Sequence, residues 1–155
     1  MKKLLFLGGS DIQVPGIEFA KSLGFFVITC DYLPENPGHK ISDKYYDVST
    51  TDLDGVLEIA RKENIDGITA YASDPAALTA SYVAEKLGLI GIPYGSANIL
   101  SNKDEFRQFL VNKGYLFPSF TNVNSINEIK DFIKQYGKSI IKPVDSSGSK
   151  GITII

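Results

Sequence analysis

A lysine at the end of an apolar strand, followed by a loop of small residues, is the segment of this sequence best suited to chemistry. An Ile-Ile pair favours a strand that ends at Lys142. In the loop 146–151 only Lys150 has a side chain larger than serine. The backbone N–H groups of such a loop can turn toward one anion, while hydroxyl and ammonium groups beside them neutralise phosphate charge. We therefore predict a polyphosphate site. Its residues would be Lys142, Ser146, Ser147, Gly148, Ser149 and Gly151.

This loop is not a Walker A phosphate loop. It lacks the Gly-Lys-Ser/Thr sequence, and it runs into the strand-like segment 152–155 rather than into a helix. A flap between two strands fits this order better. Because the loop is longer than a tight hairpin needs, we expect it to act as a lid over a ligand. Two simpler interpretations stay open, namely an ordinary surface loop and a solvated lysine at a strand end.

A second group of candidates lies where strands of the N-terminal region end. The Gly8-Gly9-Ser10 turn precedes a helix and could hold an anion at the helix N-terminus. Asp31 ends the second strand, where a dinucleotide-binding fold places its ribose-binding acid, and Ser73 and Asp74 follow another strand. The segment from Gly8 lacks the second and third glycines of the dinucleotide fingerprint, so a nicotinamide-dependent oxidoreductase is the weaker interpretation. Asp74 could equally serve only as a helix cap.

Several motifs, taken in order, resemble the ATP-grasp superfamily of ligases. In that family a strand lysine precedes a mobile glycine-rich loop that closes over the nucleotide phosphates, which is the order found at Lys142. Ser101-Asn102-Lys103-Asp104 before a helix, followed by Gly-Tyr-Leu-Phe-Pro at 114–118, is similar to the entry into the family's nucleotide-binding domain. Upstream, Gly8-Gly9-Ser10 and Asp31 resemble the carbamoyl-phosphate synthase, biotin carboxylase and amino-acid ligase branch. The resemblance covers nearly the whole chain.

The resemblance implies an enzyme that uses ATP and Mg²⁺ to convert a carboxylate into an acylphosphate, which an amine or another nucleophile then attacks. Both substrates would be small molecules, and a carbamoyl-phosphate synthase large-subunit-like ligase is the specific expectation. It also implies that Lys103 and Lys142 contact the nucleotide and that the N-terminal domain contributes to the acceptor-substrate site. The candidates for that site are Gly9, Ser10, Asp31, Ser73 and Asp74. The alternatives are a non-catalytic domain that binds a small metabolite and, less favoured, the oxidoreductase.

Strand-like and helix-like segments alternate through residues 1–94, which predicts a doubly wound α/β domain with a mostly parallel sheet. By the resemblance this is the Rossmann-like domain that precedes the ATP-grasp domain. Thr51 is expected to cap a helix, and the segment 91–96 is expected to be a linker. The expected strands are 4–7, 26–29 and 67–71, and the expected helices are 15–23, 52–63 and a helix from Asp74 that stops at Gly88.

Residues 95–155 follow a different, α+β pattern, with a helix around Phe109, a capping box formed by Ser125 and Glu128, and two strands around the loop. By the resemblance this is the first part of the nucleotide-binding domain. The chain stops on an apolar strand, so we expect a truncated domain whose magnesium ligands and catalytic groups lie beyond residue 155. The chain alone should then be inactive. Its uncovered strand edge could pair with a second copy to form a homodimer.

Composition limits the other function classes. With 155 residues, 43% hydrophobic content and a formal net charge of −2, the chain is expected to be an ordinary soluble protein with a real core. Its lysines are scattered rather than concentrated on a nucleic-acid-binding face, and no apolar run is long enough to span a membrane. Cys30 and His39 are single residues of their types, so we expect structural roles, with no disulfide, metal site or triad. These features favour a cytoplasmic location.

Overall fold

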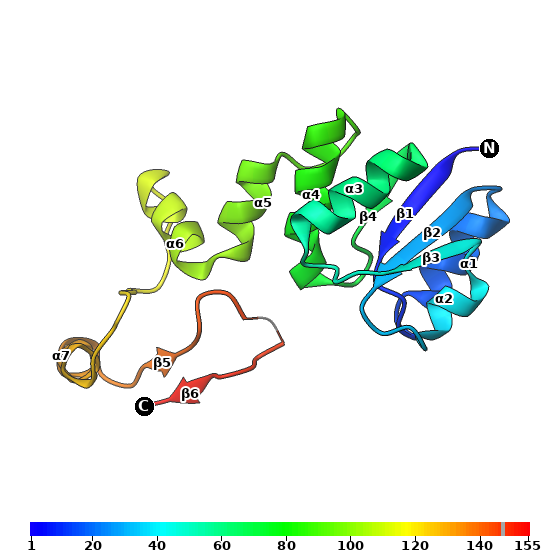
Figure 1. Ribbon diagram of the computed structural model, residues 1–155. Helices are drawn as coiled ribbons and strands as arrows, with labels where there is room; N and C mark the ends of the chain where they lie inside the picture. Colours follow the sequence, from blue (N-terminus) through cyan, green and yellow to red (C-terminus); the bar gives the residue numbers. More distant parts are fainter. Residues whose placement is uncertain (147) are drawn as a thin grey trace. The chain divides into compact units, whose positions relative to one another are not determined.

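The computed structural model covers residues 1–155, and the structure describes all of them except Ser147. The chain divides into two compact units, which we call unit 1 (Met1–Ala97) and unit 2 (Asn98–Ile155). Each can be followed by its colour in Figure 1.

Unit 1 is built on a four-stranded, entirely parallel sheet with the order β3-β2-β1-β4. The strands are β1 (Lys3–Leu7), β2 (Phe26–Asp31), β3 (Lys44–Asp47) and β4 (Gly67–Thr69). In the central strand, Leu5 lies opposite Ile28 of β2 and Ile68 of β4. Because all four strands run in one direction, their carboxyl ends meet at one edge of the sheet, where open α/β sheets bind ligands. The predicted α/β fold is therefore confirmed.

Helices cover both faces of this sheet, as Figure 1 shows. They are α1 (Val14–Ser22), α2 (Pro37–Ile41), α3 (Leu53–Glu63) and α4 (Asp74–Leu87). Leu5 and Leu7 of β1 pack in one apolar cluster with residues of α3 and α4, whereas Phe6 packs in a second cluster with Ile17 of α1. Successive side chains of a strand point to opposite faces, so a continuous apolar strand is what a sheet covered on both sides requires.

Two elements of unit 1 were not predicted, and one cap was predicted wrongly. The sequence did not reveal α2 or the edge strand β3, which contains Tyr45 and Tyr46. The cap of α3 is Asp52 rather than Thr51, since an Asp52 side-chain oxygen accepts a hydrogen bond of 3.1 Å from the Gly55 N–H. A carboxylate is a strong hydrogen-bond acceptor at this position, and its negative charge is stabilised by the partial positive charge at the helix N-terminus.

Glu63, at the end of α3, is a buried carboxylate that contacts residues of two strands, β1 and β3. Its Oε1 accepts hydrogen bonds from Lys44 Nζ at 2.6 Å and from the Tyr46 hydroxyl at 2.5 Å. Lys3 Nζ lies 3.5 Å from Oε2 and donates to the Glu63 carbonyl at 2.6 Å. The hydrogen bond from Lys44, followed by that from Tyr46, lowers the pKa of Glu63 from 4.5 to about 2. The ionised form is thus the one that the fold stabilises.

This lowered pKa predicts a specific acid sensitivity. The stabilisation from ionised Glu63 should be complete above about pH 4.5, decline below it, and be lost as the pH falls through about 2. Glu63→Gln should lower the midpoint of thermal unfolding at pH 6. Between pH 5 and pH 2 the midpoint of this variant should fall less than that of the wild-type protein. Circular dichroism melts across that range measure both effects. Glu58→Gln, an exposed position on the same helix, is the matched control; an equal effect there would contradict the assignment to the Glu63 cluster.

Unit 2 contains helices followed by a two-stranded hairpin. Helix α5 (Tyr94–Ser101) crosses the boundary between the units, so part of the expected linker is helical; α6 (Lys103–Asn112) and α7 (Ile126–Tyr136) follow. The predicted capping box of α7 is confirmed, because the Ser125 side chain accepts from the Glu128 N–H and the Glu128 side chain accepts from the Ser125 N–H. Among the described residues, no helix has the length and apolar character needed to cross a membrane.

Candidate functional site

The Gly/Ser loop of unit 2 joins two antiparallel strands, β5 (Ile140–Ile141) and β6 (Thr153–Ile154). Backbone hydrogen bonds in both directions between Ser139 and Ile155, at 2.8 and 2.9 Å, extend this pairing. The predicted arrangement of a loop between two strands is therefore confirmed. Lys142, the first residue after β5, begins the loop and is exposed.

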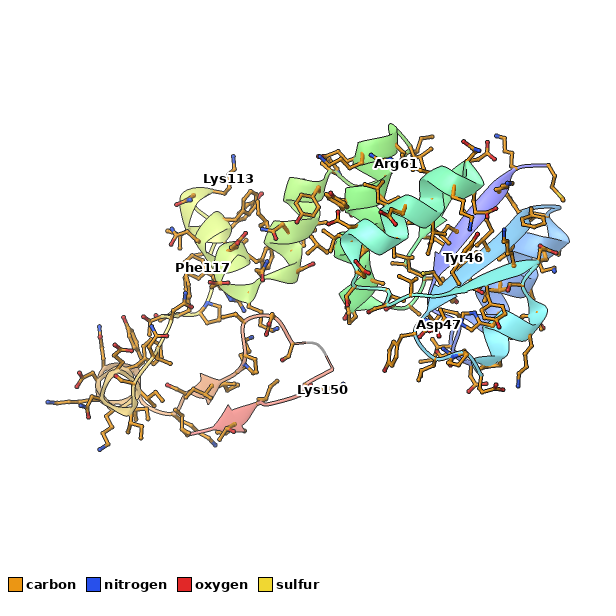
Figure 2. All side chains as sticks on the ribbon, viewed as in Figure 1. Tyr46, Asp47, Arg61, Lys113, Phe117 and Lys150 are labelled. Atoms are coloured by element: carbon orange, nitrogen blue, oxygen red, sulfur yellow. The ribbon has the colours of Figure 1, made fainter. Side chains whose placement is uncertain are left out.

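The loop folds back on itself at its base. The Ser146 hydroxyl donates to the Lys150 carbonyl at 3.0 Å, and a Cβ on Gly151 would lie only 2.8 Å from the Pro143 ring. Gly148 and Gly151 have φ values of +64° and +70°, a conformation that glycine adopts without steric cost. Figure 2 labels Lys150 in this loop. The predicted site residue Ser147 lies outside the described residues.

An open cavity of about 450 Å³ lies beside the hairpin, within unit 2. Lys142, Pro143 and Gly151 line it on the hairpin side, and residues 123–126 with Ile129 line it on the side of α7. The cavity therefore combines an exposed ammonium group, apolar side chains and the glycine at the end of the loop. The cavity is wide open to solvent, so residues from outside the hairpin and α7 would be needed to enclose a small molecule there.

Lys103, the first residue of α6, reaches the same hairpin. Its Nζ donates hydrogen bonds to the carbonyl oxygens of Ser146 and, at 3.4 Å, of Val144, and its backbone N–H donates to Val144 at 3.0 Å. The structure thus brings Lys103 and Lys142 to the base of one loop. The sequence indicated each lysine separately but gave no sign of the Lys103 contacts with the loop, which depend on tertiary structure.

These contacts predict that Lys103 holds the loop in place. Lys103→Met keeps the length of the side chain but removes its N–H donors, and bonds from a charged donor contribute roughly 1.5–3 kcal/mol each when they are sheltered from water. We expect faster amide hydrogen exchange in residues 144–151 of the variant, measured by NMR. The matched control is Lys113→Met at the other end of α6. Unchanged exchange in the Lys103 variant would show that the loop is held by other contacts.

In unit 1, the candidate residues at the carboxyl edge of the sheet are engaged with one another. The Gly9 N–H donates to Asp31 Oδ2 at 3.1 Å, and Asp31 Oδ1 accepts from the Leu33 N–H at 3.2 Å. The Ser10 N–H and hydroxyl both donate to Gln13 Oε1, at 3.1 and 2.6 Å. The N–H groups that could have held an anion at this turn are therefore already paired. Asp31 likewise accepts one hydrogen bond from a backbone N–H of the protein on each of its oxygens.

The remaining two candidates lie at the start of α4. Ser73 is the N-cap residue, but its side chain makes no capping hydrogen bond, and Asp74 is the first residue of the helix rather than its cap. The simpler interpretation of Asp74 as a cap is therefore wrong. Its carboxylate is exposed at the edge of the sheet where β4 ends.

Cys30 and His39 are buried, as their structural interpretation predicts. Burial, reinforced by nearby carboxylates, raises the pKa of the Cys30 thiol to about 12, so this group stays protonated and is a poor nucleophile. Burial also lowers the pKa of His39, whose Nδ1 lies 2.7 Å from the Thr29 hydroxyl. Within the part of the chain that the structure describes, no group of three or more His, Cys, Asp or Glu residues could hold a metal ion.

Comparison with known proteins gives relatives by sequence and by structure, although no protein-family model matches the chain. The formate-dependent phosphoribosylglycinamide formyltransferase of Wolinella succinogenes is 26% identical over 155 residues, which cover 98% of this chain and 40% of the relative. The carbamoyl phosphate synthase large chain of Pseudothermotoga lettingae is 29% identical over 170 residues, which cover 99% of this chain and 15% of the relative.

The solved structures add the fold. The N5-carboxyaminoimidazole synthetase from Staphylococcus aureus, crystallised with ADP, matches with a TM-score of 0.81 at 19% identity, over 99% of this chain and 41% of that one. The chain thus spans about two fifths or less of the length of these proteins.

Proposed function

We infer that this chain, a member of the ATP-grasp superfamily, forms the N-terminal part of an ATP-dependent ligase. In the proposed reaction the γ-phosphoryl group of ATP passes to a carboxylate, and a nucleophile then displaces phosphate from the acylphosphate. Unit 2 would bind the nucleotide, and the carboxyl edge of the sheet in unit 1 would contribute to binding of the second substrate.

The observation that carries this proposal is the meeting of two lysines at one Gly/Ser hairpin. Lys103 comes from the start of α6 and Lys142 from the end of β5, yet Lys103 bonds to carbonyl groups at the beginning of the loop that Lys142 opens. Phosphoryl transfer depends mainly on positioning and on neutralisation of phosphate charge. Two ammonium groups lie beside a loop whose glycines adopt left-handed backbone conformations, and an open cavity lies next to it. This arrangement fits that requirement.

The roles we propose follow from these positions. Lys142 would contact the α-phosphate or the adenine edge from the mouth of the cavity. Lys103 would exchange its bonds with the loop carbonyls for a bond with a phosphate oxygen. The small loop residues, among them Ser146 and Gly148, would then cover the phosphates with N–H and hydroxyl groups. When bound, Mg²⁺ supplies further neutralisation of the phosphate charge, and we assign no residue of this chain to it.

The proposal names a class of substrates, a carboxylate and a nucleophile, rather than one pair. The relatives include proteins named for different reactions, a formyltransferase and a carbamoyl phosphate synthase chain among them. The proposal is therefore a carboxylate ligase without a choice among these, and the narrower expectation of a carbamoyl-phosphate synthase is one possibility within it.

Nucleotide binding by the full-length protein tests the proposal. In isothermal titration calorimetry with Mg²⁺ present, we expect ATP to bind and NADH to give no heat of binding. Incubation with ATP and a panel of small carboxylates and amines should release ADP and phosphate in equal amounts. Binding of NADH without binding of ATP would overturn the proposal in favour of an oxidoreductase, and ATP binding without turnover of any pair would favour a binding protein.

A further inference from the structure

The side chain of Gln13 joins two turns at the carboxyl edge of the sheet in unit 1. The first turn (residues 8–13) follows β1, and the second turn (residues 70–73) follows β4, the strand that pairs with β1. Gln13 Oε1 accepts hydrogen bonds from the Ser10 N–H and hydroxyl, at 3.1 and 2.6 Å. Its Nε2 donates to the Tyr71 carbonyl at 3.0 Å. Gln13 therefore connects the first turn to the second.

The chemistry of these partners fixes the orientation of the Gln13 amide. A backbone N–H can only donate and a backbone carbonyl can only accept, so Oε1 must face Ser10 and Nε2 must face Tyr71. Gln13 is 4% exposed, which shelters both bonds from water. A carboxylate or a thioether of the same length would lack the donor that reaches Tyr71, so the contact is specific to an amide.

Packing around Gln13 strengthens the connection. The side chain lies on Gly8, where an added Cβ would stand 3.0 Å from Gln13 Cδ and where φ is +112°. The Tyr71 ring lies against Gly16 of α1, since a Cβ there would stand 3.1 Å from Tyr71 Cδ1. The second turn is thus fastened to the region of α1 through both the carbonyl and the ring of Tyr71.

The backbone of the second turn is strained directly after this contact. Ala72 has a φ of +53°, a left-handed conformation that is costly for a residue with a Cβ. Such residues persist where the surrounding structure holds them. Among the described residues, Gln13 supplies the only side-chain hydrogen bond to residues 70–73, and the Ser73 side chain makes no capping bond to α4. We therefore attribute the hold on this turn largely to Gln13.

The two turns carry most of the candidate residues for the second substrate. Gly9 and Ser10 lie on the first turn, whereas Ser73 ends the second turn and Asp74 begins α4. The fifth candidate, Asp31, accepts a hydrogen bond from the Gly9 N–H and so is tied to the first turn. A site shared by two turns is only as precise as the contact that holds the turns together.

We propose that Gln13 is a positioning residue, which holds the two turns in a fixed relative position for the second substrate of the ligase. It acts through the Tyr71 carbonyl and needs no contact with the substrate. This inference rests on the proposed function, which assigns this edge of the sheet to the second substrate. Loss of the bond should loosen the second turn and weaken binding there, and it should leave nucleotide binding by unit 2 unchanged.

Gln13→Glu tests the connection without any substrate. The introduced carboxylate keeps the shape of the side chain, but it can donate to the Tyr71 carbonyl only when it is protonated. Burial should raise its pKa above the ordinary value of about 4.3. The Ala72 N–H belongs to the same peptide group as the Tyr71 carbonyl. Its NMR signal should therefore differ from that of the wild-type protein near pH 7.5 and approach it near pH 4.5.

Two NMR results would contradict the connection. An Ala72 signal that matches the wild-type signal at both pH values would show that the bond does not hold the turn. A difference that stays the same on acidification would show that the missing donor is not its cause. Either result would overturn the proposal.

Steady-state kinetics of the full-length protein test the consequence for binding. The assay uses ATP with the pair of small carboxylate and amine that gives turnover. Gln13→Met should raise the KM for one of these two organic substrates about tenfold and change the KM for ATP by less than about twofold. Gln13→Glu near pH 7.5 takes its place if the methionine variant does not fold.

Ser81→Ala is the matched control for the kinetic test. The Ser81 hydroxyl is also buried, and it donates to the Ala77 carbonyl within α4 at 2.9 Å, away from both turns. Its loss should leave every KM unchanged. Unchanged KM values in Gln13→Met, an equal rise for ATP, or an equal rise in Ser81→Ala would overturn the positioning role. Absence of turnover with every pair would instead overturn the ligase assignment, and the Ala72 signal would then decide alone whether Gln13 holds the turns.

Discussion

Leu5→Ala should lower the free energy of unfolding of unit 1 by about 2–5 kcal/mol, the usual range for a buried leucine. Leu5 lies in the central strand, is fully buried, and has neighbouring strands on both sides. It belongs to the cluster that packs the sheet against α3 and α4. Its truncation leaves a cavity that the surrounding backbone cannot fill, because hydrogen-bonded partners on both sides hold β1 in place. Urea unfolding followed by circular dichroism measures the change.

Leu23→Ala is the matched control for this prediction. It removes the same atoms from a side chain that is 61% exposed, just after α1, and should change the free energy of unfolding by no more than about 0.5 kcal/mol. If both variants lost stability equally, the core of unit 1 would not lie where the structure places it. Chemical shifts in unit 2 should be unchanged in the Leu5 variant, provided that the two units fold separately.

The elements with strong apolar periodicity were predictable from the sequence. The central strands are uniformly apolar because helices cover both faces of the sheet, and α3 and α4 have apolar residues at helical spacing with a left-handed C-cap, Asn64 and Gly88 respectively. In contrast, α2 has only five residues and contains a proline and a glycine, and β3 is an edge strand with exposed residues. Neither buries enough apolar surface to leave a pattern.

Glycine and proline misled the interpretation of the segment between the two units. The residues 91–96 have the composition of a loop, yet α5 begins at Tyr94, directly after Pro93. Proline is compatible with the start of a helix, since the N–H it lacks would have no partner there. The Pro93 carbonyl accepts from the Ala97 N–H at 3.0 Å, which starts the helical pattern. Composition alone could not separate a linker from a helix N-terminus.

The site shows a similar division between local and tertiary information. The lysine and loop around residue 142 were visible because strand, lysine and small residues are neighbours in the sequence. The contacts of Lys103 with the loop, and the pairing of Gly9 with Asp31, join residues far apart in the chain, and the sequence carried no sign of them. The second pairing changes the interpretation of the turn, because a carboxylate of the protein takes the place expected for an anionic ligand.

Lys142→Ala should weaken the binding of Mg-ATP by roughly 1.5–3 kcal/mol in the full-length protein, the value of a charge-assisted hydrogen bond. Lys142 is exposed, lines the open cavity beside the hairpin, and makes no hydrogen bond or ion pair with a described residue, so its removal should leave the fold intact. The loss should therefore appear in nucleotide affinity and not in the temperature of unfolding. Isothermal titration calorimetry and a thermal melt measure the two quantities on the same sample.

Two further variants make this result specific. Lys142→Arg keeps the positive charge and should recover part of the affinity, although the guanidinium group cannot reproduce the point charge of the ammonium group. Lys138→Ala removes a lysine four residues earlier, before β5, and should leave ATP affinity unchanged. The ATP affinity of the wild-type protein should also fall with added salt, and more steeply than that of the Lys142→Ala variant. The reason is that the wild-type protein has one more contact between an ammonium group and a phosphate, which salt screens. ATP affinity that is equal in the wild-type and Lys142→Ala proteins would remove Lys142 from the nucleotide site and leave the cavity beside the hairpin without a phosphate-binding role.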